Sequence, residues 1–400
     1  MEQSDKQFSK WRWLLALVGL FMYLGDICTD TALVLRYFHE KLYVWSGLTA
    51  LFIITGLTVN QIFSYAWFLE DMHKNVMDSK PKRRYLVLHI FGMGILLRSC
   101  QLLKQGYKEI WGQEMPHNQT SENGDEEGSS ASHHSKLFSD TADLSMLKLF
   151  ETFLESAPQL LLQLYIHQNH EEWSVLQSIS MVFSFFNLAW SLVDYRICLR
   201  KSLPQSRELP SGLPTAVYLL YKLFTITSLI LSYSLLLILS VYSTVGFTSL
   251  WLLGTIRAHR LETSFCSSGA LELLYRGVIG AILVFTFFNV KGQGTKRDMT
   301  VYYFFWTVIN FSTPLLMFFL KPELKTITFL LVVSGVIYGG SLLGLILLVL
   351  YYRFLHPKQE AKKLSDQVDG QENMNGQENV DGQEKETTPS TRRTREFIKP

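Results

Sequence analysis

Cysteine and charge are both scarce in this sequence. Only four cysteines occur among its 400 residues (Cys28, Cys100, Cys198 and Cys266), and no two of them are spaced as a pair. This spacing argues against a disulfide framework and against a zinc site built from cysteines. Charged residues make up 18% of the chain and hydrophobic residues 48%. The mean hydropathy of +0.13 is high for a soluble protein.

Catalytic motifs are also missing. The sequence contains no HExxH, no GxSxG and no glycine-rich loop of the kind that cradles phosphates. The glycine context that intramembrane aspartyl proteases require around their two aspartates is absent as well. His133 and His134 are adjacent, but no third metal ligand lies near them in the sequence. We therefore do not expect an enzyme, and we expect no cofactor, metal ion or nucleic-acid partner.

Long apolar runs dominate the chain instead. A helix needs about 20 apolar residues to span the bilayer. Runs near that length lie at 13–37, 43–69, 85–103, 144–166, 173–195, 215–242, 270–290, 301–320 and 326–352, and a shorter one lies at 246–256. The sequence therefore predicts an all-α polytopic membrane protein.

Basic residues predict the orientation of these runs. They cluster before the first run (Lys6, Lys10, Arg12), in 74–84, in 196–207 and after Arg353. Because such residues collect on the cytoplasmic side, both termini are expected in the cytosol. An even number of spans must then separate successive basic segments. Three runs lie between 74–84 and 196–207 and five between 207 and the tail, so one run in each half does not fully cross.

We therefore expect eight transmembrane helices and two re-entrant half-helices, in two similar halves at about 11–200 and 210–355. The short 246–256 run is the re-entrant candidate in the second half. Part of 144–166, which Pro158 interrupts, is the candidate in the first. Re-entrant segments persist only where protein buries them or where they line a wet cavity. Paired halves of this kind are typical of transporter-like folds.

Three polar segments adjoin or interrupt the spanning domain at 11–355. Residues 1–10 form a short cytosolic N-terminus. Residues 112–142 form a Ser- and Gly-rich insert that we expect to be mobile. Residues 356–400 are predicted to be a disordered cytosolic tail, in which a six-residue repeat begins at Val368, Met374 and Val380.

Ionisable residues inside the apolar runs are candidate functional residues, because each costs at least about 2.5–3.5 kcal/mol to insert. Three pairs are spaced by four and so share a helix face: Asp26 with Asp30, Glu151 with Glu155, and Glu272 with Arg276. Arg98, Asp143 and Asp194 complete the set.

Three interpretations of these charges remain open. Paired carboxylates would serve catalysis. Alternatively, Arg98 and Arg276 would neutralise acids inside the bundle and fix helix packing. In the third interpretation the charges form a polar track through the membrane for something charged. The like-charged pairs would repel unless cations or water lie near them, which favours a hydrated or partnered groove.

The segment DLSMLKLFETFLESAPQLLLQLYI at 143–166 resembles the hallmark segment of the XK-related family of membrane proteins. The resemblance covers nearly the whole chain and includes GDICTD, YVWSGL, LVDYRICLRKSLP, ELLYR, FTFFNVKGQGTK and YYRFLHP. It points to the caspase-activated scramblase branch of the family. The tail repeats and the longer acidic insert at 112–142 depart from the family pattern.

This resemblance implies a phospholipid scramblase with eight spans and two re-entrant half-helices, in agreement with the parity argument. Such proteins expose phosphatidylserine on the plasma membrane in apoptosis as an engulfment signal, without ATP, after a caspase removes the tail. The charges at Asp26, Asp30, Arg98, Asp143, Glu151, Glu155 and Asp194 match family positions thought to stabilise the fold or line a headgroup path. Trp45 matches a tryptophan near that path. Whether a single-span chaperone subunit is needed stays open.

The tail contains a candidate caspase site. Asp366-Gln-Val-Asp369 followed by Gly370 has the form that executioner caspases cleave. The motif is short and weak alone, and its place in the tail of this family is what supports it. Asp381 followed by Gly382 is a second, weaker candidate, because Glu378 stands where the protease prefers Asp. The alternatives to a scramblase are a membrane transporter and a structural subunit of a membrane complex.

Overall fold

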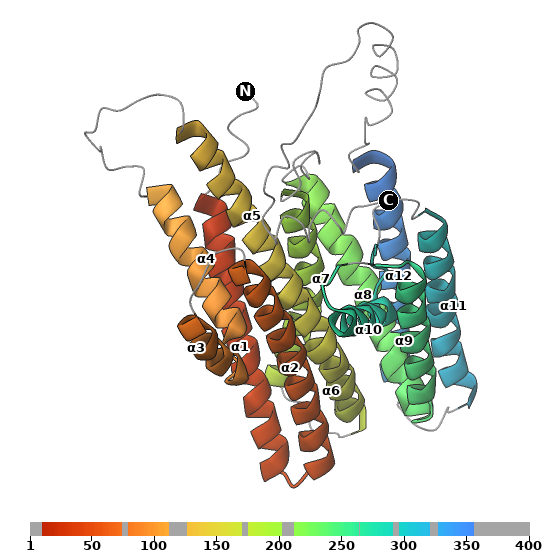
Figure 1. The fold of residues 1–400 in the computed structure, drawn as a ribbon. Coiled ribbons are helices and arrows are strands. Elements are labelled where there is room, and N and C mark those ends of the chain that lie inside the picture. The colour runs from red at the N-terminus through yellow and green to blue at the C-terminus, as the bar shows by residue number, and fades with distance from the viewer. Residues whose placement is uncertain are drawn as a thin grey trace, which may run out of the picture.

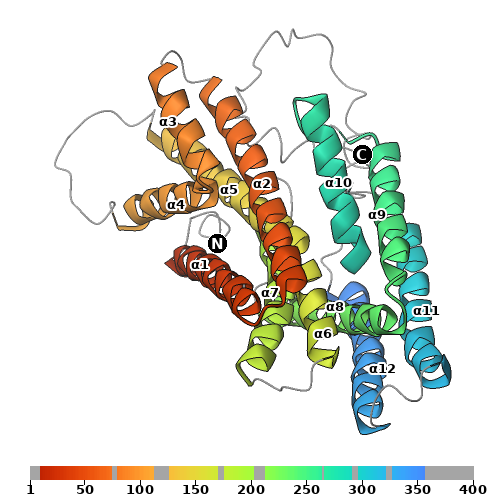
Figure 2. The same ribbon diagram turned by 90° about the horizontal axis from the view of Figure 1, so that it is seen from below.

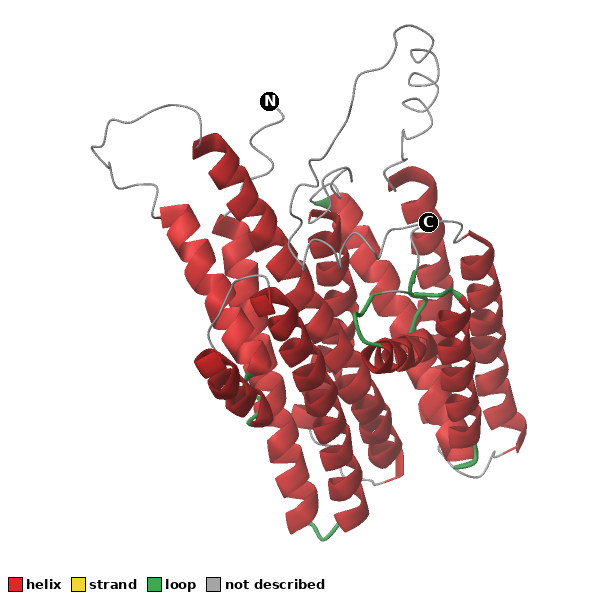
Figure 3. Cartoon of the chain, viewed as in Figure 1, coloured by secondary structure: helices red, strands yellow, loops and turns green. Residues whose placement is uncertain are grey.

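A computed structural model describes residues 10–73, 79–111, 126–169, 175–201, 212–263, 265–290, 296–320 and 327–355. Within these ranges all regular elements are helices (Figure 3). They are α1 (Lys10–His39), α2 (Tyr43–His73), α3 (Ser79–Ile90), α4 (Gly94–Trp111), α5 (Glu126–Glu151), the π-helical turn η3 (Thr152–Ser156), α6 (Ala157–Asn169), α7 (Val175–Lys201), α8 (Leu213–Leu239), α9 (Ser243–Arg260), α10 (Gly269–Phe285), α11 (Lys296–Leu320), α12 (Ile327–Leu350) and η4 (Tyr351–Leu355).

Most of the helices run along a common direction (Figure 1). The start of α1, the end of α7, the start of α8 and the end of α12 lie at the upper end of that view, and the α1–α2 and α8–α9 turns lie at the lower end. The basic residues at the end of α7 and Arg353 of η4 therefore lie at the same end. Six of the described helices are long and apolar enough to cross a membrane, or up to seven if a bent pair counts as one span. This architecture agrees with a polytopic all-α membrane protein.

The sharpest break in the first half lies between α3 and α4. The segments Arg83–Ile90 and Gly94–Trp111 meet at 118°. Gln61 of α2 bridges the turn, because its Nε2 donates to the Gly92 carbonyl at 3.1 Å and its Oε1 accepts from the Gly94 amide at 2.9 Å. Backbone groups inside a bilayer need partners within the protein, and this one side chain supplies two.

The run at 144–166 was expected to contain the re-entrant segment, but its helix continues through α5, η3 and α6. Pro158 has no amide hydrogen to donate and would crowd the preceding turn of a regular α-helix. The wider π turn comes just before it, and the Ala157 amide bonds to the Thr152 carbonyl. The proline is thus absorbed by a local π-bulge. The whole insert at 112–142 was expected to be mobile. Its second part, 126–142, belongs to the same helix, and Leu137 and Phe138 of this part are buried.

In the second half the predicted re-entrant run at 246–256 lies inside α9, which is continuous over 18 residues. The helix that lies across its neighbours is α10, seen nearly end-on in Figure 1 and lengthwise in Figure 2. Glycines bring α9 and α10 together. A Cβ added to Gly254 would lie 3.1 Å from the Cα of Gly280. Neither α9 nor α10 is among the six long apolar helices, so which of the two does not fully cross the membrane stays a prediction.

Aromatic packing joins the two halves. Tyr275 of α10 is fully buried, and its ring centre lies 6.1 Å from that of Phe150 in α5 and 4.8 Å from that of Phe265. Phe265 in turn packs against Trp67 of α2, with 6.0 Å between the ring centres. Because aromatic side chains bury large areas, this contact makes one continuous core from both halves.

Candidate functional site

Four carboxylates gather in the middle of the first half: Asp26 and Asp30 of α1, Glu151 at the end of α5 and Glu155 of η3. We call them the acidic cluster. The hydroxyl of Ser156 donates to Asp26 Oδ2 at 3.1 Å, and Gln159 Nε2 donates to Asp30 Oδ1 at 2.6 Å. The four carboxyl groups interact electrostatically with one another. The two pairs that the sequence placed on single helix faces therefore face each other.

The acidic cluster is short of hydrogen-bond donors. Asp30 Oδ2 and Glu155 Oε2 are buried and have no neutral or cationic donor in the described part of the chain, so the hydrogen bond between the two carboxyl groups requires a proton on one of them. The amide oxygen of Gln159 also has no donor, and the Tyr23 hydroxyl, near Glu151 and Glu155, is buried without a hydrogen-bond partner among the described residues. Burial without donors is costly for an anion, so such a group needs water, a proton or a cation from outside the protein.

A glycine makes room for the acidic cluster. A Cβ added to Gly56 of α2 would lie 2.8 Å from Glu155 Oε2 and 2.9 Å from its Cβ. No side chain fits there without displacing Glu155. No feature of the sequence points to this role, because a glycine inside an apolar run can equally serve close packing of two backbones.

A line of polar groups leads from the acidic cluster toward the upper end of the bundle. Lys148 of α5 interacts electrostatically with Glu151 and with Asp194 of α7. The Cys198 thiol lies 3.6 Å from Asp194 Oδ1 and contacts both terminal nitrogens of Arg12, at 3.8 and 3.9 Å. The sequence singled out Asp194, whereas the structure adds Lys148, Cys198 and Arg12 to the same path.

Arg98 is held by α2. Its Nε donates to the Ser64 hydroxyl and its Nη2 to the Ser64 carbonyl, both at 3.0 Å. Asp143 is buried and interacts electrostatically with Asp140. The Asp140 carboxyl group also interacts electrostatically with Arg98 and Asp71. This group lies apart in sequence from the acidic cluster and includes two carboxylates, Asp71 and Asp140, that the sequence reading missed.

Trp45 lies at the other end of the bundle, near the start of α2. Its ring centre is 5.7 Å from that of Tyr165 in α6. It packs against a small hydrophobic cluster of Tyr37, Leu162 and Ile166. Trp45 is therefore placed at the end opposite the basic segments.

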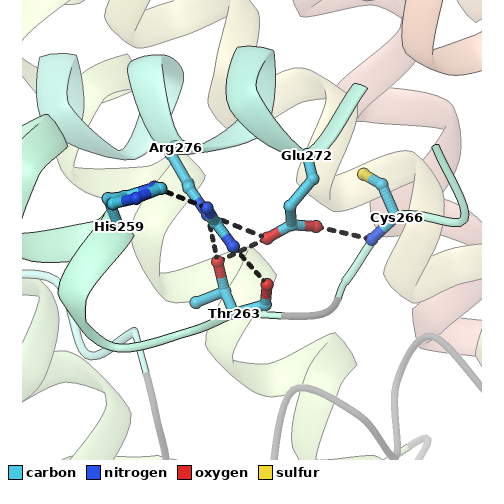
Figure 4. A network of polar contacts seen from close by, with 5 residues as sticks. All are labelled: His259, Thr263, Cys266, Glu272 and Arg276. Carbon is cyan, nitrogen blue, oxygen red and sulfur yellow. Dashed lines mark hydrogen bonds and ion pairs between the residues drawn. The ribbon is translucent and has the colours of Figure 1, made fainter. Parts of the chain in front are cut away.

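Glu272 and Arg276 belong to a separate set of contacts in the second half (Figure 4), which we call the Glu272 network. The Thr263 hydroxyl donates to Glu272 Oε1 and the Cys266 amide donates to Oε2 at 2.7 Å. Arg276 Nε lies 3.4 Å from Glu272 Oε1 and donates to the Thr263 hydroxyl at 3.1 Å.

The rest of Arg276 is also bound. Its Nη2 donates to the Thr263 carbonyl at 2.7 Å, and its Nη1 lies 2.7 Å from His259 Nδ1. The guanidinium thus ties α10 to the end of α9 and to the connection between them. For this pair the geometry agrees with the interpretation that the charges fix helix packing.

The remaining candidates cannot be placed. The caspase-site residues Asp366, Asp369, Gly370, Asp381 and Gly382 lie outside the described residues. Within the described ranges, no three His, Cys, Asp or Glu side chains are arranged to hold a metal ion.

Comparison with known proteins identifies the family. The profile of the XK-related protein family matches residues 14–357. XK-related protein 9 of Tetraodon nigroviridis is 54% identical over 374 residues, which cover 92% of this chain and 96% of that protein. XK-related protein 8 of Pan troglodytes is 30% identical over 89% of this chain and 87% of its own length, and that of Gasterosteus aculeatus is 28% identical over 88% and 86%. The chain therefore belongs to the XK-related family.

Proposed function

We propose that this protein is a phospholipid scramblase of the plasma membrane, one that moves lipids between leaflets without ATP and catalyses no covalent reaction. Family membership over nearly the whole chain supports the proposal. The observation that carries it is the acidic cluster with its line of polar groups toward the basic end. A lipid needs only a polar furrow for its headgroup, because its tails remain in the bilayer.

The cluster fits one part of a phospholipid headgroup in particular. Phosphatidylserine and the zwitterionic lipids carry an ammonium group as well as a phosphate. The buried, donor-poor oxygens of Asp30 and Glu155 are suited to accept hydrogen bonds from such a cation. Lys148 and Arg12, farther along the line, are suited to the phosphate. The headgroup would then move along the line from the acidic cluster past Lys148 to Arg12, with its ammonium and phosphate groups bound by side chains of opposite charge.

The proposed topology has eight spans. They are α1, α2, the continuous α5–η3–α6, and α7 in the first half, with α8, α9, α11 and α12 in the second. The α3–α4 hairpin and α10 are the two re-entrant segments. This order places each re-entrant segment after the second span of its half, as two similar halves require, with both termini in the cytosol.

The tail is the proposed lock. An executioner caspase would cut after Asp369, with Asp381 as a second site, and would remove the end of the chain from the cytosolic face. A contact within one chain becomes a weak contact between two molecules once the link is cut. Phosphatidylserine exposure in apoptosis is the expected result, and a single-span chaperone subunit is the proposed partner in delivery to the surface.

One second candidate has its own support. The Glu272 network and the Ser64–Arg98 contact are charged groups fully bound within the protein. If the other charges act in the same way, the protein is a structural subunit of a membrane complex, and a transporter for another solute is the remaining alternative.

A fluorescent-lipid assay in proteoliposomes separates these functions. Lipid exchange between leaflets is measured before and after executioner caspase treatment, with Asp369→Ala as the uncleavable control. We expect exchange only when Asp369 can be cut. Exchange before and after cutting would retain the scramblase and remove the tail as its lock. No exchange in either state, with the cut confirmed by mass, would favour the structural subunit or the transporter.

A further inference from the structure

Basic side chains gather at the proposed cytosolic end of the bundle, where the first half ends with α7 and the second begins with α8. Lys222 of α8 is 2% exposed. Its ammonium donates to the Thr286 hydroxyl at 3.0 Å and to the Phe287 carbonyl at 2.9 Å. Both acceptors are neutral, so the hydrogen bonds hold the charge without cancelling it.

Arg196 of α7 lies beside this lysine in an aromatic setting. Its guanidinium carbon is 4.4 Å from the ring centre of Tyr218 and 5.4 Å from that of Tyr351. The two rings lie 5.0 Å apart, so they hold the guanidinium between α8 and η4. We call Arg196, Tyr218, Lys222 and Tyr351 the cationic pocket.

Within the described residues the cationic pocket has no counter-charge of its own. Arg196 is close enough to Lys222 and to Arg200 for the positive charges to repel one another. The contacts of Arg196 and Lys222 with the described residues are to aromatic rings, hydroxyls and a carbonyl, and none is to a carboxylate. Buried like charges without an anion are unfavourable, so this region is suited to bind one.

The surroundings of the cationic pocket favour a lipid over a small ion. Phe354 of η4 is 70% exposed and Leu213 at the start of α8 is 69% exposed. In a membrane protein such side chains offer contact surface to acyl chains. An anion that sits between buried cations and an apolar rim is therefore expected to carry a hydrocarbon portion.

We propose that the cationic pocket binds the phosphate group of an anionic phospholipid from the cytosolic leaflet. The planar guanidinium of Arg196 is suited to bind two phosphate oxygens at once, and Tyr218 and Tyr351 fix its orientation. Lys222, held behind it by Thr286 and Phe287, adds positive charge in its ammonium form, which a bound anion favours. Arg200 extends the positive region along the last turn of α7.

This inference deepens the proposed function, since the pocket would collect acidic lipids at the end of the bundle from which phosphatidylserine departs. It differs from the acidic cluster in charge and in place, because it lies where the two halves meet, between α7, α8 and η4. Binding is measurable without any lipid crossing the membrane, so the two ideas can fail separately.

The test uses the intact chain, solubilised in detergent, and short-chain phosphatidylglycerol as the probe. This lipid carries the anionic phosphate but no amine, so the acidic cluster offers it no counter-charge. Binding is followed by the rise in unfolding temperature as lipid is titrated, with phosphatidylcholine and inorganic phosphate as separate arms. The variants are Arg196→Gln and Lys222→Met. Arg353→Gln is the control, because Arg353 is an exposed cation at the same end whose guanidinium lies 5.8 Å from the Phe354 ring.

We expect a saturable rise with phosphatidylglycerol and little with the other two probes. The apparent affinity should fall about tenfold or more in Arg196→Gln and in Lys222→Met, and it should stay within about twofold in Arg353→Gln. If Arg196→Gln fails to fold by circular dichroism and size-exclusion chromatography, Lys222→Met decides, since an apolar side chain in place of an uncompensated buried charge is expected to fold.

Two results would overturn the proposal. An equal rise with inorganic phosphate would make the pocket a binder of free anions. Unchanged affinity in the folded pocket variants would place the anionic lipid elsewhere. Tight binding in a protein that moves no lipid would leave the pocket standing and remove the proposed scrambling.

Discussion

The Glu272 network and the acidic cluster are both made of charges inside a helical bundle, yet they are built in opposite ways. In the network both oxygens of Glu272 accept hydrogen bonds and one faces Arg276. In the cluster four carboxylates face one another, and Asp30 Oδ2 and Glu155 Oε2 have no neutral or cationic donor among the described residues. The charges of the Glu272 network are neutralised within the protein, whereas the acidic cluster requires water, protons or a cation from outside.

This difference separates two uses of an intramembrane charge. A matched pair fixes a loop and a helix, and its loss costs stability. A group of unmatched anions makes the fold less stable, so it indicates a function that the rest of the bundle has to accommodate. The sequence presents both regions alike, as charged residues spaced by four.

The largest expected effect comes from breaking the matched region. Arg276→Met leaves Glu272 buried without its cation, so we expect a loss of about 3–5 kcal/mol in the free energy of unfolding. Thermal unfolding in detergent measures it. Arg257→Met is the control, because the Arg257–Asp298 ion pair is largely exposed and should contribute under about 1 kcal/mol. Equal losses in both variants would show that burial does not distinguish the two pairs.

At the α3–α4 turn the groups that find partners inside the protein are backbone groups, the Gly92 carbonyl and the Gly94 amide. Gln61→Leu removes both partners of the turn, and we expect about 1–3 kcal/mol of destabilisation for each buried group left unpaired. Hydrogen exchange at the amides of this turn should rise more than in α1. Unchanged protection would mean that the turn is held by contacts other than Gln61.

A steric change tests the acidic cluster. Gly56→Ala places a methyl group against Glu155, and overpacking of this kind costs about 1–3 kcal/mol. Gly47→Ala in the same helix meets nothing within 4 Å and serves as the matched control. The two variants are compared for unfolding temperature and for lipid exchange. We expect only Gly56→Ala to lower both, and a harmless Gly56→Ala would mean that Glu155 moves aside easily.

The same substitution should act with opposite sign in the two regions. Glu155→Gln removes one of four like charges, so the unfolding temperature should stay equal or rise, whereas Glu272→Gln should lower it. Lipid exchange by the cut protein should fall about tenfold in Glu155→Gln, equivalent to about 1.4 kcal/mol in the barrier. A fall in stability in both variants would place the acidic cluster among the structural charges.

The sequence predicted the helical class and the pairing of Asp26 with Asp30 and of Glu151 with Glu155 on shared faces. It predicted non-crossing segments at 144–166 and 246–256, and the structure has continuous helices at both places. Pro158 looked like a break, but a π turn absorbs it within a continuous helix. The sharp bend instead lies at 83–111, where Gln61, 31 residues away from Gly92, satisfies the turn.

Apolar runs, the positions of basic residues and the four-residue spacing of charges are local properties, and they determined by themselves that this is a polytopic helical protein with ionisable groups inside it. Which charges meet was decided only by the tertiary structure. Asp30 and Gln159 are 129 residues apart, and Arg12 and Cys198 are 186 residues apart. Whether a buried charge is neutralised depends on what other helices bring to it, and helical periodicity carries no information on that partner.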